Sequence, residues 1–146
     1  MSFAGMNYLA IVIAAIAGWL TGAVWYGLLA KYWVTALGTT MEEFKQKQTA
    51  LKGDPKAFLP FVLAFVADLI MAWMLAGVLG HLGPGQVTLH NGVISGLFLW
   101  FGFVLTTMMV NNAFSGRKYT LTAIDAGHWL VVLLVMGTIV GGLGLK

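Results

Sequence analysis

The distribution of charge along the chain constrains the fold most. Three long stretches, residues 1–30, 69–116 and 126–145, contain no Asp, Glu, Lys or Arg, and Asp68 is the one formal charge inside an otherwise apolar span. A run of about 20 apolar residues is long enough for a helix to cross a bilayer core of about 30 Å. Charged residues make up only 9% of the chain, whereas soluble domains carry about 25%. The sequence therefore predicts an integral membrane protein.

The apolar runs favour four membrane spans in a single domain, residues 1–146. We expect these spans near residues 7–30, 58–80, 91–113 and 122–143, packed as an all-α, four-helix antiparallel bundle. Asp54-Pro55 has the pattern of a helix N-cap followed by proline in the first turn, just before the second span. The fourth span is expected to begin at Thr122, with Asp125 completing a capping box.

Basic residues are unevenly distributed among the predicted loops. The second loop has none and the tail has only Lys146, whereas the first and third loops hold the others: Lys31, Lys45, Lys47, Lys52, Lys56, Arg117 and Lys118. Because Lys and Arg are enriched in cytoplasmic loops, both termini are expected to lie outside the cytoplasm. Trp25, Tyr26 and Trp33 would then anchor the bundle at the inner interface, where amphipathic rings are favoured.

The first cytoplasmic loop is the longest polar segment. Thr40-x-x-Glu43 matches a capping box, and Met41, Phe44 and Leu51 share one face at helical spacing. This pattern predicts a short interfacial helix whose lysines face anionic head groups. The alternative is a plain solvated connector.

Small residues recur at four-residue steps in the predicted spans. Such ridges let helix backbones approach closely in lipid, where the hydrophobic effect does not drive helices together. We expect helix packing at these positions, with spans one and two meeting along their ridges. The glycines of the ridges are Gly18, Gly22, Gly92, Gly96, Gly137 and Gly141.

Asp68 lies about ten residues inside the second span, close to the midplane. A charged Asp at the centre of a membrane helix costs about 2.5–3.5 kcal/mol on insertion scales, so such residues usually face the bundle interior. One hypothesis is a neutral Asp68 that hydrogen-bonds Thr21 or a backbone carbonyl and holds helices together. The other is a group that binds a proton or a ligand.

Further polar residues could extend from Asp68 toward the cytoplasmic side. Asp125 and His128 are spaced i, i+3 and share a helix face, while Asn111 and Asn112 end the third span at a similar height. Each also has a purely structural interpretation: Asp125 as the capping-box acid, His128 as an interhelical hydrogen bond, the Asn pair as a span terminus. The series covers only the cytoplasmic half, which favours an inward-opening pocket over a channel.

Several functional classes are not expected. The chain has no cysteine, which excludes disulfides, thiolate metal sites and cysteine nucleophiles. Asp-x-x-His occurs once, whereas di-iron bundles repeat a Glu-x-x-His motif, so neither a metal site nor a cofactor is expected. No nucleophile elbow or zinc motif indicates an enzyme. The lysines lie beside apolar spans and form no basic helix face, so nucleic acid is not an expected partner.

Two stretches resemble a bacterial membrane family catalogued as domain of unknown function 1761. The first runs from Asn7-Tyr8 through Trp25-Tyr26 to Tyr32-Trp33, and the second comprises Asn111 or Asn112, Phe114, Gly116-Arg117 and Ala126-Gly127-His128. The chain departs from the family pattern at Gly27-Leu28, where Ser-Pro is usual, and at Asp125, where a neutral amide is usual. The resemblance implies a four-helix protein of a bacterial plasma membrane and no activity.

These observations lead to two functional hypotheses. The first is a non-enzymatic multi-pass membrane protein that acts as a self-assembling bundle, hence a homo-oligomer, or as an accessory subunit of a larger membrane complex. The second is a small-solute or proton-coupled transporter in which Asp68 and His128 bind the coupling proton. In both, the lipid bilayer is a partner.

Overall fold

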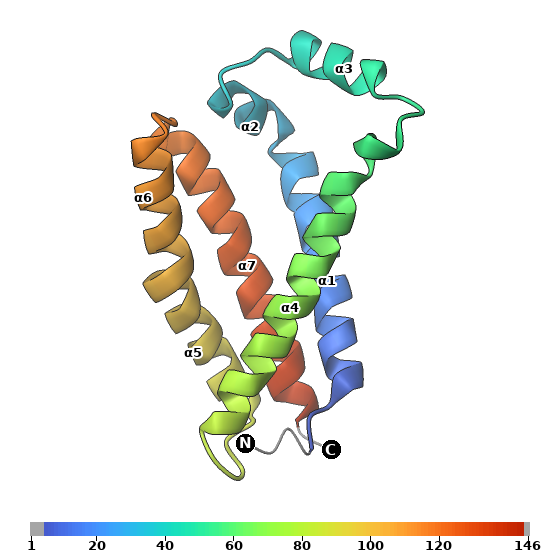
Figure 1. The fold of residues 1–146 in the computed structure, drawn as a ribbon. Helices are drawn as coiled ribbons and strands as arrows, with labels where there is room; N and C mark the ends of the chain where they lie inside the picture. Colours follow the sequence, from blue (N-terminus) through green and yellow to red (C-terminus); the bar gives the residue numbers. More distant parts are fainter. Residues whose placement is uncertain (1–4, 145–146) are drawn as a thin grey trace.

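The computed structural model describes residues 5–144, and within this range it contains helices and connecting turns but no strand (Figure 1). Four helical segments are long and apolar enough to cross a membrane: Tyr8–Leu28, Pro55–His81, Leu89–Phe114 and Tyr119–Leu143. The all-helical, four-span architecture expected from the sequence is thus confirmed. Lys146, counted in the charge tally, lies outside the described residues.

Two spans are single helices, one is built from two segments and one from three. The first span is α1 (Tyr8–Leu28), the second is the short 3-10 helix η1 (Pro55–Ala57) followed by α4 (Leu59–His81), and the fourth is α7 (Tyr119–Leu143). The third span consists of α5 (Leu89–Leu99), the π-helix η2 (Trp100–Leu105) and α6 (Thr106–Phe114). Two short helices, α2 (Ala30–Ala36) and α3 (Met41–Ala50), connect the first two spans.

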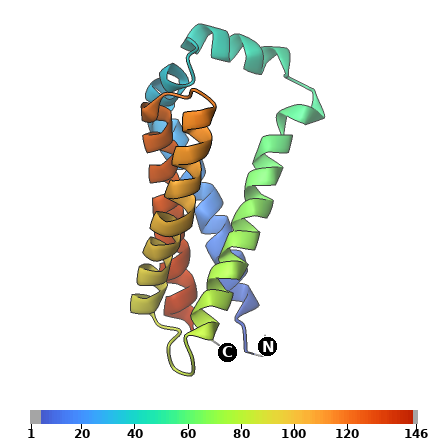
Figure 2. The ribbon, with the colours of Figure 1, turned by 60° about the vertical axis from the view of Figure 1, so that its left-hand side comes forward.

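The two ends of the molecule differ in composition. α1 begins and α7 ends beside the loop between α4 and α5, and we call this the terminal end (Figures 1 and 2). The opposite end carries α2, α3 and the turn between α6 and α7. We call it the basic end, because its loops hold the lysines and the arginine of the sequence tally: Lys31, Lys45, Lys47, Lys52, Lys56, Arg117 and Lys118.

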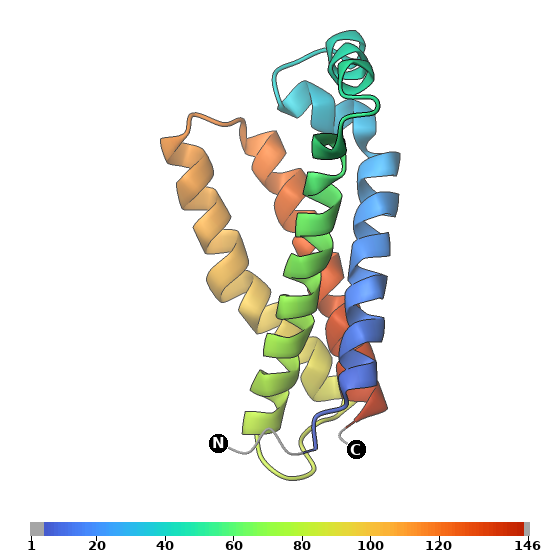
Figure 3. The same cartoon turned by 45° about the vertical axis from the view of Figure 1, so that its right-hand side comes forward.

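α7 is the central helix of the four spans. It packs against α1 and α5 and also contacts α4, while α4 packs against α1 (Figure 3). The buried apolar cluster lies in the half of these helices nearer the terminal end. Its buried members are Ile11, Ala14, Ala15, Ala72, Leu75, Ala76, Leu79, Val132, Met136 and Val140.

Glycines make the closest contact between two spans, α5 and α7. A Cβ atom at Gly92 would overlap the carbonyl oxygen of Gly137, and one at Gly137 would overlap the carbonyl oxygen of Gly92. Gly96 lies against Leu133 of α7, whose carbonyl oxygen is 2.7 Å from the position of a Gly96 Cβ. A Cβ atom at Gly141 would overlap the carbonyl oxygen of Thr88. Backbone contact of this kind gives the dense packing that holds helices together in lipid.

The α1 ridge packs differently from the sequence expectation. α1 and α4 do lie against each other, but Gly18 faces the Met136 and Val132 side chains of α7 as well as Asp68 of α4. Gly22 faces His128 of α7. The α1 glycines therefore make room for side chains rather than for another backbone.

Helix starts follow local sequence in two places. In the Thr40 capping box, the Glu43 amide donates to the Thr40 hydroxyl at 3.2 Å and the Thr40 amide donates to the Glu43 carboxylate at 3.2 Å. The Thr39 hydroxyl also donates to this carboxylate, which lowers the pKa of Glu43 below its usual value. The predicted Asp54 cap forms too, accepting from the Lys56 amide at 2.8 Å.

The predicted start of the fourth span was wrong. α7 begins at Tyr119, after Lys118 as N-cap, so Thr122 and Asp125 lie inside the helix. The Thr122 hydroxyl accepts a hydrogen bond from the Asn112 side chain at 2.9 Å, and Asp125 accepts one from Tyr26 at 2.8 Å. Both side chains are therefore engaged by other helices rather than by the first turn of their own.

Candidate functional site

The polar side chains inside the bundle lie toward its basic end, on α1, α4 and α7. Asp68 and His128 are almost fully buried, with 3% and 6% of their surface exposed. Each has one side-chain atom, Asp68 Oδ1 and His128 Nδ1, with no hydrogen-bond partner among the described residues. Buried polar atoms without a partner are rare and costly, so these two positions define the candidate site.

Asp68 points at the small-residue ridge of α1. Its Oδ1 atom is 3.4 Å from the position that a Cβ of Gly18 would occupy, so the missing side chain at Gly18 leaves space for the carboxyl group. The structure contains no hydrogen bond between Asp68 and Thr21, and the Thr21 hydroxyl instead donates to the Ala17 carbonyl of its own helix at 2.8 Å. This detail of the sequence hypothesis was wrong.

His128 lies one turn along the same ridge. Its Nε2 atom is 3.0 Å from the position that a Cβ of Gly22 would occupy. Two aromatic rings flank the imidazole, with centroid distances of 5.0 Å to Tyr26 and 4.7 Å to Trp129. The imidazole is therefore packed between an aromatic side chain of α1 and one of α7.

Asp125 links α7 to α1 on the side of His128 that is nearer the basic end of the molecule. Its Oδ1 atom accepts a hydrogen bond of 2.8 Å from the Tyr26 hydroxyl. Hydrogen bonds to an ionised carboxylate are stronger than those between neutral groups. Asp125 thus bonds to a residue 99 positions away in the sequence, in place of the capping role considered above.

Asp68, His128 and Asp125 lie against successive positions of α1. Gly18, Gly22 and Tyr26 are each four residues apart, so each is about 6 Å further along the helix. Asp68 faces the first position, His128 the second, and Asp125 bonds to the third. We call Asp68, His128, Tyr26 and Asp125 the polar series.

The polar series therefore contains one member that sequence reasoning missed, and lacks two residues, Asn111 and Asn112, that the sequence analysis included. Tyr26, predicted only as an interface anchor, connects Asp125 to His128. Asn112 instead bonds Thr122, and Asn111 is exposed. The four-residue spacing from Gly18 through Gly22 to Tyr26 was a signal that could have placed Tyr26 on the same face.

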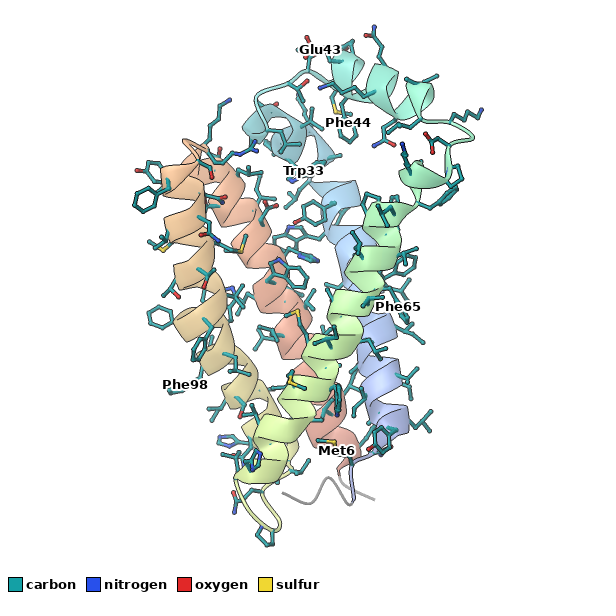
Figure 4. The ribbon with its side chains drawn as sticks, viewed as in Figure 1. Met6, Trp33, Glu43, Phe44, Phe65 and Phe98 are labelled. Atoms are coloured by element: carbon teal, nitrogen blue, oxygen red, sulfur yellow. The ribbon has the colours of Figure 1, made fainter. Side chains whose placement is uncertain are left out.

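The other predicted anchors also contact neighbouring helices. The Trp25 indole donates to the Ile124 carbonyl of α7 at 3.0 Å. Trp33 makes an edge contact with Phe44 of α3, at a centroid distance of 5.7 Å, and Figure 4 shows both residues below α3. In η2, the Trp100 indole donates to the Ala126 carbonyl at 2.7 Å. Hydrogen bonds and ring contacts thus fasten both α1 and the third span to α7.

The polar series stops at Asp68. Beyond it, toward the terminal end, the buried residues of α1, α4 and α7 are apolar, and most of them belong to the apolar cluster. Within residues 5–144, no three His, Asp or Glu side chains come close enough together to share a metal ion. The two other histidines of the chain, His81 and His90, are exposed at the terminal end.

Comparison with known proteins adds one finding. A family model described as "Protein of unknown function (DUF1761)" matches residues 9–141, nearly the whole chain, and covers all but the first two residues of the stretches that carried the resemblance. No curated protein and no solved structure matches the chain.

Proposed function

We propose a function from the premise that the chain belongs to the DUF1761 family, whose description assigns no activity. Our proposal is a non-enzymatic, proton-binding membrane protein. In it, Asp68 and His128 take up and release protons inside the membrane and couple this change to the transport of a small solute.

One observation carries this proposal: two titratable side chains are buried together on the α1 ridge, each with an unpartnered polar atom. An unsatisfied buried group costs about 1–3 kcal/mol, and ionisable residues inside membranes usually mark ion or proton pathways. Histidine also changes its charge near physiological pH more readily than other side chains. A site that gains hydrogen-bonding capacity by binding a proton explains why both groups are there.

The geometry favours proton exchange from the basic end. The polar series runs from Asp68 to Asp125 in that direction, whereas the apolar cluster fills the other half. We propose that the basic end faces the cytoplasm and that the protein resides in a plasma membrane, as the distribution of lysines favours. Transport of a solute would then require the apolar half to open.

Removing either titratable group should change the number of protons that the protein binds. We expect Asp68→Asn and His128→Gln each to take up about one proton fewer per chain than wild type when the pH is stepped from 8 to 5. The measurement uses protein in lipid nanodiscs, in weakly buffered solution with a pH-sensitive dye. Asp54→Asn makes the same chemical change at the protein surface and should leave the count unchanged. Wild-type counts in both site variants would refute the proposal.

A second observation favours assembly with other membrane helices. Only 6% of the third span is buried within the chain, compared with 28% of each of the first two spans and 44% of the fourth. A shallow groove of about 260 Å³ lies on this span, lined by Leu97, Phe98 and Phe101, and Phe98 points away from the other spans (Figure 4). The glycine ridges are used inside the chain, so we propose this outer face of α5 as the contact with a second copy or another membrane subunit.

Mass measurement in native-like lipid tests assembly directly. We expect particles heavier than one chain, and we expect Phe98→Ala together with Phe101→Ala to shift the distribution toward monomers. Phe61→Ala, which removes a similarly exposed ring from α4, serves as the control. A wild-type protein that is strictly monomeric and carries no other subunit would contradict this second candidate.

A further inference from the structure

We infer that Tyr26 controls proton access to His128 from the basic end, by closing α1 against α7. This inference rests on the proposed proton-binding function and adds a positioning residue to it. Three features carry it: the place of Tyr26 along the helices, the hydrogen bond that holds its ring, and the contacts that link it to the surface helix α3.

Tyr26 and Asp125 lie between His128 and the basic end. On α1, Tyr26 is one turn closer to that end than Gly22, which faces His128. On α7, Asp125 is nearly one turn closer to that end than His128 itself. The hydrogen bond of 2.8 Å between them therefore bridges α1 and α7 on the route that a proton would take to the imidazole.

The Tyr26 ring is held on both sides. One side contacts the His128 imidazole at a centroid distance of 5.0 Å, and the ring also makes an edge contact with Trp33 at 5.2 Å. The Tyr26 hydroxyl is at the same time bonded to Asp125, so Tyr26 cannot swing away from His128 without losing its hydrogen bond.

A continuous series of ring contacts extends this arrangement to the surface of the molecule. Phe44 of α3 contacts Trp33, Trp33 contacts Tyr26, and Tyr26 contacts His128. α3 has no buried residue and lies across the basic end (Figures 1 and 2). A displacement of α3 would therefore reach His128 through two intervening rings.

The groups that face His128 define what its protonation would change. On α1, Tyr26 contacts the imidazole, and Gly22 leaves an open position beside it. On α7, Trp129 contacts the imidazole, and Asp125 is linked to it through its hydrogen bond with Tyr26. From α4, Asp68 faces the same α1 ridge one turn away. Two aromatic rings thus contact the imidazole, one carboxyl group is linked to it through Tyr26, and a second lies one turn away along the ridge. The closed Tyr26–Asp125 bond controls how fast the proton arrives, not whether it binds.

The test separates the rate of proton uptake from its amount. In a His81→Gln, His90→Gln background, His128 is the only histidine left, and a stopped-flow pH jump on nanodisc-embedded protein then resolves its slow uptake from that of exposed groups. We expect Tyr26→Phe, which keeps the ring and loses the hydroxyl, to accelerate the slow phase about tenfold or more at unchanged amplitude. A factor of ten corresponds to about 1.4 kcal/mol, and a hydrogen bond to a charged group contributes at least that much.

Matched variants decide the outcome. Tyr8→Phe removes the same hydroxyl from an exposed tyrosine at the terminal end and should leave the rate unchanged. Asp125→Asn keeps a weaker acceptor and should give an intermediate rate, which provides a second reading if Tyr26→Phe folds poorly. An unchanged rate in both Tyr26→Phe and Asp125→Asn would overturn the inference about Tyr26. The absence of any His128 uptake in the parent protein would instead refute the proposed function itself.

Discussion

Gly137→Leu should separate α5 from α7 and lower the free energy of unfolding by about 3 kcal/mol or more. A Cβ at Gly137 would meet the backbone of Gly92 and Val93, and backbone atoms cannot move aside as the end of a flexible side chain can. Because the clash lies in the most closely packed contact of the bundle, α5 must move away from α7 to relieve it. Van der Waals packing is the main attraction between helices in lipid, and this movement loses it.

Unfolding in mixed detergent micelles, followed by circular dichroism as sodium dodecyl sulfate is added, measures this change. Gly80→Leu is the matched control, because nothing lies within 4 Å of a Cβ at that position of α4. We expect Gly80→Leu to change stability by less than about 1 kcal/mol. If the two variants unfolded at the same detergent fraction, the glycine contact between α5 and α7 would not contribute as described.

Asp68→Ala should have the opposite effect and raise the free energy of unfolding. The substitution removes a buried carboxyl oxygen that has no hydrogen-bond partner among the described residues, and an unsatisfied buried group costs about 1–3 kcal/mol. Part of this gain is offset by lost packing against Gly18. We expect a net gain of about 1 kcal/mol, together with the loss of one bound proton. Asp68 would then lower the stability of the protein while it supplies a proton-binding group that the proposed function requires.

Leu75→Ala on the same helix provides the comparison. Leu75 is 1% exposed and belongs to the apolar cluster, and truncation of a buried leucine to alanine typically costs about 2–5 kcal/mol. The same micelle titration compares both variants with wild type. A loss of stability in Asp68→Ala similar to that in Leu75→Ala would show that Asp68 serves only to hold the helices together.

The sequence predicts those parts of the structure that depend on neighbours along the chain. The four spans follow from the length of the apolar runs, and each begins or ends within a few residues of its predicted position. The Thr40 capping box forms because both of its hydrogen bonds join residues only three positions apart. No partner from elsewhere in the fold competes for these side chains.

Sequence reasoning was less successful where a tertiary partner competes for a side chain. Thr122 and Asp125 match a capping box in which Asp replaces the usual Glu, yet Asn112 and Tyr26 engage them instead. Tyr26 was assigned to the membrane interface because its type is common there. Its bond to Asp125 joins residues 99 positions apart, and no local pattern specifies such a pair. Likewise, the lack of a partner at Asp68 and His128 becomes visible only when the neighbouring helices are in place.

The π-helix η2 has a geometric consequence for the third span. At 3.6 residues per turn, the stretch from Gly92 to Asn112 would carry Asn112 about 200° around the helix axis from Gly92, and so away from α7. A π turn takes one additional residue to complete, which reduces this offset by about 100°. Glycine contacts at one end of the span and the Asn112–Thr122 hydrogen bond at the other can therefore both be made to α7. The wider turn acts as an angular correction that keeps a long helix in phase with its neighbour.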